Sequence, residues 1–220
     1  MAEKKSAPVS AVLTLAITAL LVLYSQLVHS VDDSIAPPIL PRVDKLREEL
    51  RSAPETRITL GNLDVILEST TLKDILRSAG AGTIENRGDA SESQYWICYT
   101  ATAGKKTQRI WIMSGEMGGD QHDVDSFHAE EDVSPAKSNR CPELPAHLIP
   151  MSFGKSIWLG SSQRQINDWL GEPSLTTNGW SFYSYSGPSS LKDFDESVLI
   201  GVRIINGRVV SLFASKTTTN

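Results

Sequence analysis

The chain contains only two cysteines, Cys98 and Cys141, among its 220 residues. Two are too few for the cross-linked framework of a small disulfide-rich scaffold. Basic residues are also in the minority, because 21 Lys and Arg stand against 26 Asp and Glu, for a formal net charge of -5. Affinity for nucleic acid depends mainly on Lys and Arg at phosphates, so this balance argues against a nucleic-acid-binding protein. Hydrophobic residues make up 40% of the chain, which excludes a disordered protein and is enough for a packed core.

The sequence also lacks the short motifs of common enzyme classes. It has no Gly-x-Ser-x-Gly nucleophile elbow and no Ser-x-x-Lys accompanied by its partner motifs. The glycines between Gly115 and Gly119 are not followed by the Lys of a phosphate-binding loop. We therefore expect a non-enzymatic protein, with no catalytic residue and no cofactor.

Charged residues are absent between Ser6 and Val31, directly after a basic start that contains Lys4 and Lys5. The densest apolar part of this stretch, residues 11–23, is short for a membrane span, and small residues follow at 28–30. This pattern predicts a secretory signal peptide that is cut after Ser30. The alternative is an uncleaved signal anchor, with residues 6–31 in the inner membrane, on a structural subunit. In both cases we expect the rest of the chain to be exported, to the periplasm or as a secreted protein.

Export also bears on the two cysteines. In an oxidising compartment an isolated pair usually forms one disulfide, so we expect Cys98 and Cys141 to pair. Chain entropy for a loop of this length predicts a stabilisation of about 4 kcal/mol. Two buried free thiols are the alternative.

Two stretches with a similar pattern lie about 90 residues apart. Residues 64–80 and 156–171 each contain a short apolar segment, a Ser or Thr N-cap, an amphipathic helix and a closing glycine. An aromatic strand and two more strands follow each helix. We therefore predict an α+β fold of two tandem β-α-β-β-β units, with the helices packed on one face of an antiparallel sheet.

This reading divides the chain into five segments. Residues 36–41 contain three prolines and cannot form a helix, whereas residues 42–53 have the spacing of a short amphipathic helix. The predicted segments are 1–30 (signal peptide or signal anchor), 31–56 (Pro-rich spacer and short helix), 57–133 (first unit), 134–150 (linker) and 151–220 (second unit).

Strand side chains alternate between the two faces of a sheet, which lets us predict an open face. Aliphatic positions such as Ile110 and Val202 are expected to face the helices, and Trp96, Trp180 and Phe182 are expected in the core. The remaining aromatic set and one arginine are assigned to the open face: Tyr95, Tyr99, Trp111, Tyr183, Tyr185 and Arg203. Tyr, Trp and Arg dominate protein-binding hot spots, so these six residues are the predicted partner-binding site. The alternative is that half-buried strands favour aromatic residues in any case.

Residues 159–173, the strand at 180–183 and the hairpin around Asn206 and Gly207 resemble the SmpA/OmlA outer-membrane lipoprotein family. The duplicated pattern resembles the β-lactamase-inhibitor-protein-like (BLIP-like) fold, in which two such units form a concave sheet. The chain departs from the lipoproteins in lacking a lipid-bearing Cys, and from the inhibitors in having one cysteine pair instead of one per unit. The resemblance implies an exported, non-enzymatic module that binds an unidentified envelope or secreted protein through its open sheet face.

The main alternative function rests on the acidic segment 116–132, which holds seven Asp and Glu residues together with His122 and His128. Mixed His and carboxylate ligands suit zinc or manganese, so the chain is alternatively a metal-binding or metal-dependent envelope protein. However, the two histidines are six residues apart, a spacing that fits neither one helical face nor an EF-hand. A solvated acidic hairpin is the simpler interpretation, and no metal ligand is assigned.

Overall fold

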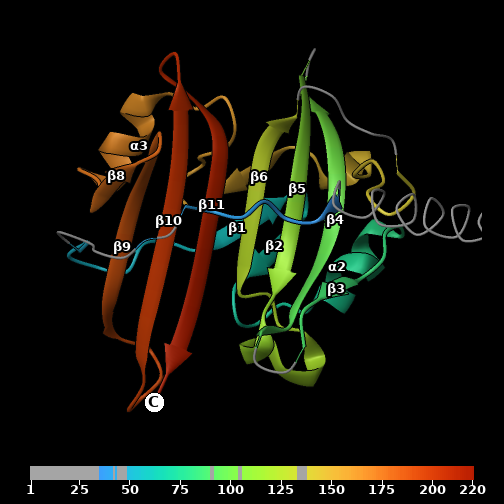
Figure 1. Cartoon of the computed structure of the whole chain (residues 1–220), viewed down its shortest axis with the longest axis horizontal. Coiled ribbons are helices and arrows are strands. Elements are labelled where there is room, and N and C mark those ends of the chain that lie inside the picture. The colour runs from blue at the N-terminus through green and yellow to red at the C-terminus, as the bar shows by residue number, and fades with distance from the viewer. Residues whose placement is uncertain (1–34, 42, 44–48, 90–91, 104–105, 133–137) are drawn as a thin grey trace, which may run out of the picture. The chain divides into compact units, whose positions relative to one another are not determined.

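The eight-stranded antiparallel sheet in Figure 1 is the main element of the structure, a computed structural model that describes residues 35–41, 43, 49–89, 92–103, 106–132 and 138–220. The signal peptide or anchor predicted at the N-terminus lies outside these residues. So do residues 42 and 44–48 of the helix predicted over 42–53, and residues 49–53 are not helical. Within the described ranges, no helix has the length and apolar character needed to cross a membrane.

The described residues form eleven strands in two antiparallel sheets. The large sheet has the order β3-β4-β5-β6-β11-β10-β9-β8, and the small sheet has the order β2-β1-β7. The strands are β1 (Arg57–Leu60), β2 (Leu63–Ile66), β3 (Glu85–Arg87), β4 (Gln94–Ala103), β5 (Lys106–Ser114), β6 (Ser126–Asp132), β7 (Met151–Phe153), β8 (Leu175–Thr177), β9 (Trp180–Pro188), β10 (Asp195–Ile205) and β11 (Arg208–Thr219). The helical elements are α2 (Leu72–Ala79), α3 (Gln163–Leu170) and the 3-10 helices η3 (Glu116–Gln121) and η4 (Ala146–Leu148).

The predicted α+β fold of two tandem β-α-β-β-β units is wrong, because the described chain is mostly β-strand and its two α-helices have only eight residues each. The strand expected at 156–159 does not form, and its Ile157 makes only an isolated bridge to Phe153. Strands β1 and β2 form a hairpin that pairs with β7 in the small sheet and does not join the large one. A local apolar run predicts a strand but not the strand with which it pairs, so the sequence did not show how the two sheets are organised.

The two helices begin and end at the residues that the sequence pattern predicts. Thr71 and Ser162 are the N-caps, and each forms a reciprocal capping box with the side chain three residues later. Gly80 closes α2 in the left-handed conformation, at φ 65°, which glycine adopts without steric cost. Leu72 and Ile75 lie on the buried side of α2, so the helix contributes one apolar stripe to the core.

The hydrophobic core lies against one face of the large sheet, called here the back face. Directly opposed residues of antiparallel strands share a face, and a continuous apolar row crosses the sheet at Ile97, Ile112, Phe127, Ala214, Ile200 and Tyr183. Residues of the small sheet and of both helices complete the same core, including Ile58, Val65 and Ile166. In Figure 1, β1 and β2 lie behind the part of the sheet formed by β6 and β5. The opposite surface of the large sheet is the front face.

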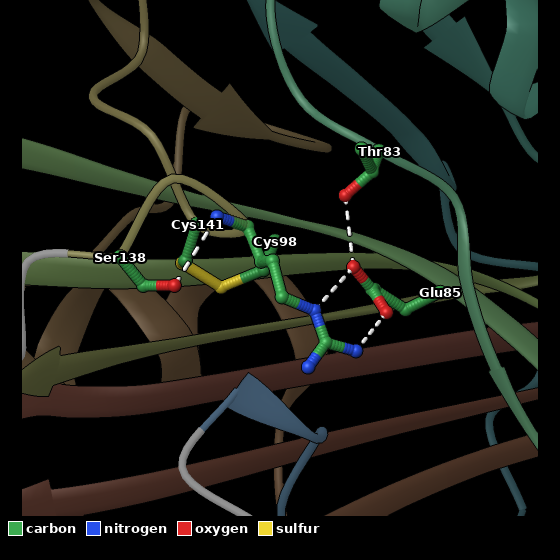
Figure 2. Close-up of a disulfide and its surroundings, with 6 residues drawn as sticks. Thr83, Glu85, Cys98, Ser138 and Cys141 are labelled. Atoms are coloured by element: carbon green, nitrogen blue, oxygen red, sulfur yellow. Dashed lines mark hydrogen bonds and ion pairs between the residues drawn. A yellow bond between two sulfur atoms is a disulfide. The ribbon is translucent and has the colours of Figure 1, made fainter. Parts of the chain in front are cut away.

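A disulfide joins Cys98 of β4 to Cys141, as the sequence predicts, across a sequence separation of 43 residues. Figure 2 shows this bond beside Glu85 and Thr83. The Thr83 hydroxyl donates to Glu85 Oε1 over 2.8 Å, and Arg140 binds both Glu85 carboxylate oxygens, with Nε at 2.8 Å. The bound guanidinium lowers the pKa of Glu85. The disulfide and this ion pair therefore hold one loop to the edge of the sheet.

Backbone hydrogen bonds continue the attachment of this loop to β4. The Thr100 N–H donates to the Pro142 carbonyl at 2.9 Å, and the Leu144 N–H donates to the Thr100 carbonyl at 2.7 Å. The loop thus covers an edge of β4 that the three residues of β3 leave open, and an exposed strand edge is a liability that proteins usually cover.

Replacing both cysteines, by Cys98→Ala with Cys141→Ala, should lower the free energy of unfolding by about 4 kcal/mol, because the unfolded chain regains the entropy of a 43-residue loop. Denaturant unfolding followed by circular dichroism measures this change. Wild-type protein treated with a reductant is the matched control and should unfold at the same denaturant concentration as the double variant. An unchanged transition in both samples would contradict a stabilising role for the disulfide.

Candidate protein-binding face

The front face of the large sheet carries a layer of aromatic side chains. The strand register places one row across it, at Cys98, Trp111, His128, Phe213, Gly201 and Phe182. Trp96 lies two positions from Cys98 along β4, and Trp180 lies two positions from Phe182 along β9, so both share this face. A sheet with its core on one side usually presents polar residues on the other. The front face instead carries three tryptophans and two phenylalanines, each at most 9% exposed, so it is a candidate binding surface for a partner that displaces what covers it.

His128 of β6 lies at the centre of this aromatic layer. Its ring centroid is 5.5 Å from that of Trp111, 5.7 Å from that of Trp180 and 6.4 Å from that of Phe213. Trp180 belongs to β9, three strands away in the sheet order, so its ring must lie flat across the intervening strands to reach His128. The aromatic layer is therefore one connected cluster across the two halves of the sheet.

Gly201 of β10 makes room for this arrangement. A Cβ atom at Gly201 would lie 2.9 Å from Phe182 Cε1 and 3.3 Å from Trp180 Cε3. An isolated glycine inside a strand often marks a place where another group approaches the backbone closely. Here the missing side chain lets the Trp180 and Phe182 rings cross β10 toward His128.

His128 is almost fully buried, with 2% of its surface exposed, and its Nε2 lies 2.7 Å from Ser211 Oγ. Burial, together with the positive charge of Arg203, lowers the pKa of His128 to about 4. The Glu130 carboxylate lies 3.9 Å from the same ring nitrogen but does not offset the loss of water around the imidazole. His128 is therefore a neutral ring at physiological pH and part of the aromatic layer.

Ser211, His128 and Glu130 do not form a catalytic triad. In a triad the serine and the acid bind opposite ring nitrogens, whereas both oxygens here approach Nε2. Ser211 is also only 1% exposed, so its hydroxyl is closed to a substrate. Its second hydrogen bond, to the Ala129 carbonyl at 3.3 Å, is a structural contact.

A segment from the N-terminal part of the chain covers the front face. Residues 37–41, with the sequence Pro-Pro-Ile-Leu-Pro, are called here the strap. In Figure 1 the strap is part of the blue segment that crosses in front of β11, β6 and β5. Pro37 is buried, whereas Ile39 is 88% exposed. A pocket of about 290 Å³ is lined by strap residues Pro37, Pro38, Ile39 and Leu40 and by Arg87, Gln94, Met113, Ser126, His128 and Phe213.

Arginine side chains border the aromatic layer. The Arg109 guanidinium carbon lies 5.7 Å from the Trp111 ring centroid, and that of Arg87 lies 5.8 Å from the Trp96 ring. Both distances fit cation–π contacts. Arg203, in β10, is exposed. The front face thus combines a buried aromatic centre with a rim of three arginines, of which Arg109 lies directly opposite Glu130.

Of the six residues predicted for the open face, the structure places only Trp111 and Arg203 on the front face. The other four, which are Tyr95, Tyr99, Tyr183 and Tyr185, lie on the back face and pack against the core. Their assignment to the open face is wrong, because Ile97 pairs with Ile112 and so brings the neighbouring tyrosines to the core side.

The same error removed three residues from the predicted site. Trp96, Trp180 and Phe182 were expected in the core and are buried as expected, with at most 7% of their surface exposed, but they lie on the front face. Within one strand, alternation shows which residues share a face, but only pairing with a neighbouring strand shows which face it is. The glycine at 201, inside an apolar strand, was the signal in the sequence that aromatic rings cross that position.

The acidic segment does not gather its histidines into one site. The His122 ring lies 4.1 Å from the Tyr95 ring, whereas His128 lies on the front face of β6. Asp125 accepts hydrogen bonds from the Gly115 N–H at 2.5 Å and from the Ser126 hydroxyl at 2.6 Å, and burial raises its pKa. Within the described ranges, no group of three or more His, Cys, Asp and Glu side chains is arranged to hold a metal ion.

The low pKa of His128 predicts a pH-dependent stability. Folding requires the neutral ring, whereas the unfolded chain takes up a proton near the ordinary His pKa of about 6.5. This contribution is therefore complete above about pH 6.5 and is lost as the pH falls toward about 4. Between about pH 7 and about pH 5, we expect the free energy of unfolding to fall by about 2 kcal/mol.

Chemical denaturation at the two pH values measures this loss, and His128→Gln should remove most of it while keeping a polar contact to Ser211. His147→Gln is the matched control, because His147 is exposed, and it should retain the full pH dependence. An equal pH dependence in the wild type and in His128→Gln would show that His128 is not a buried neutral ring.

The comparisons with known proteins give no assignment. No family model matches the chain, and the searches of curated proteins and of solved structures find no match. The resemblance of residues 159–173 and 180–183 to the SmpA/OmlA and BLIP-like proteins therefore stays a hypothesis. The assignment of functional residues in this chain therefore depends on its own structure alone.

Proposed function

We propose that the chain is an exported, non-enzymatic protein-binding module and that its binding surface is the front face of the large sheet. The observation that carries this proposal is the aromatic layer on the side of the sheet opposite the core. Three tryptophans, two phenylalanines and a neutral histidine there exceed what a sheet needs on its outer side. All six side chains are less than 10% exposed, so this layer becomes an apolar interaction surface when the strap that covers part of it moves away.

The residue types on this face support a protein partner. Trp and Arg are the residues in which binding energy is most often concentrated, and they act best in desolvated pockets surrounded by a polar rim. Trp111 and Trp96 each have a guanidinium group near the ring, and the exposed side chain of Arg203 adds a further positive charge. A partner surface with apolar and acidic side chains complements this arrangement.

Two features support export. The predicted signal peptide over residues 1–30 directs the chain out of the cytoplasm, and the Cys98–Cys141 disulfide persists best in an oxidising compartment. Periplasmic or secreted localisation is therefore proposed, with residues 6–31 as an inner-membrane anchor if the signal is not cleaved. The resemblance to envelope and inhibitor proteins points to the same class of function.

Reversing the charge at the rim of the front face tests this proposal. Arg203→Glu should lower partner binding by about tenfold or more, because a hot-spot residue typically contributes over about 1.4 kcal/mol. Partner recovery is measured by chemical cross-linking of the full chain in the envelope of an expressing cell, followed by mass spectrometry.

Arg164→Glu provides the matched control, because Arg164 is an exposed arginine of α3, away from the strands of the front face. It should leave the cross-linked partners unchanged. If both variants recover the same partners in the same amounts as the wild type, the front face is not the binding surface.

A further inference from the structure

We propose that the front face binds an extended proline-rich segment of a partner protein, and that the strap holds this place until the partner's segment displaces it. This inference rests on the proposed binding function of the front face and adds the chemistry of the partner. The strap shows which kind of chain the face accepts, because three of its five residues are proline.

The conformation of such a segment matches the surface beneath it. Proline fixes φ near about −65° and pushes the preceding residue toward an extended conformation, so residues 37–41 lose little entropy when they bind. Aromatic-lined surfaces exploit this property when they bind proline-rich segments. The front face offers such a lining in His128 and Phe213, which border the pocket beside the strap, and the Trp111 and Trp180 rings pack against His128.

An unpaired donor on the same face favours a ligand with free carbonyl groups. Trp96 is 4% exposed, and its indole Nε1 has no hydrogen-bond acceptor among the described residues. A buried donor without an acceptor lowers the free energy of unfolding, so its presence needs a physical reason. The backbone carbonyls of a polyproline-type segment make no internal hydrogen bonds and are suitable acceptors. Trp96 lies directly opposite Met113, which lines the pocket beside the strap.

The strap itself fills the face incompletely. Ile39, its β-branched residue, points into solvent with 88% of its surface exposed, while a pocket of about 290 Å³ remains between the strap and the sheet. A cavity of about 150 Å³ can hold a benzene ring. A partner segment with an aromatic or large aliphatic side chain would fill this pocket with Met113 and Phe213 as apolar neighbours.

The rim of the pocket adds a preference for charge. Arg87 is exposed, lines the pocket and lies over the Trp96 ring. A carboxylate on the bound segment could pair with this guanidinium in a charge-assisted hydrogen bond. The ligand class is therefore a proline-rich segment that carries one bulky apolar residue and a neighbouring Asp or Glu.

The experiment measures binding of a fluorescein-labelled peptide with the sequence of residues 35–43 to the full chain by fluorescence anisotropy. Wild-type protein should bind weakly, because the strap competes as an intramolecular ligand. A strap variant with Pro37→Ser, Pro38→Ser, Ile39→Ser and Leu40→Ser should bind about tenfold more tightly, since its face is free for a larger fraction of time. A peptide with its prolines replaced by serine should bind neither protein.

Two further changes test the details. Replacing the Ile39 counterpart of the peptide by Phe, with Asp beside it, should strengthen binding to the strap variant. Trp96→Phe in the strap variant should weaken binding about fivefold, because it removes only the indole donor, whereas Trp169→Phe on the other side of the sheet should have no effect. If the strap variant with four substitutions does not fold, the single substitution Pro38→Ser replaces it, and we expect a smaller gain in affinity for the peptide.

The inference is overturned if a folded strap variant binds the peptide no better than the wild type. It is also overturned if the strap variant binds a serine-substituted peptide equally well, or if the wild type forms a dimer by exchanging straps, since the occupant is then a second copy. If the peptide fails but Arg203→Glu still loses its cross-linked partner, the proline-rich ligand is wrong and the proposed function stands. If both tests fail, the front face is not a binding surface.

Discussion

The antiparallel pairing of β6 with β11 holds the two halves of the large sheet together. It joins β3–β6 to β8–β11 in one continuous sheet, and it gives that sheet one face for the core and one for the aromatic layer. The same register sets His128 opposite Phe213 and brings His128 within reach of the Ser211 hydroxyl. Without this pair each half would have an open edge and neither half would carry a complete front face.

The front face depends on two further constraints, both of them steric. Gly201 leaves the space through which Trp180 and Phe182 lie across β10, and the strap then covers part of the layer that results. The strap, at five residues, is a thin cover for these aromatic rings compared with the packed core on the back face. Light cover keeps the surface out of water and still allows a ligand to replace it, which is the basis of the proposed function.

Local determinants explain what the sequence could predict. The N-caps Thr71 and Ser162 bond to residues only three positions later, so the sequence shows both partners. The chain has only two cysteines, so each thiol has one possible partner within the chain. The sheet could not be predicted in this way, because pairing between β6 and β11 joins residues more than 80 positions apart. The faces of β4 and β9 were reversed because the pairing of β4 with β5 and of β9 with β10 was also missing, so only Trp111 and Arg203 of the predicted site lie on the front face.

In this structure the strap lies on an aromatic face that is separate from the core. Fluorine NMR of protein labelled with 5-fluorotryptophan tests it directly, because the chain has five tryptophans on two sides of one sheet. Serine substitution of strap residues Pro37, Pro38, Ile39 and Leu40 should shift the resonances of Trp96, Trp111 and Trp180. Those of Trp158 and Trp169, which pack in the core, should stay in place. Five unchanged resonances, or shifts confined to Trp158 and Trp169, would show that the strap does not lie on the aromatic face.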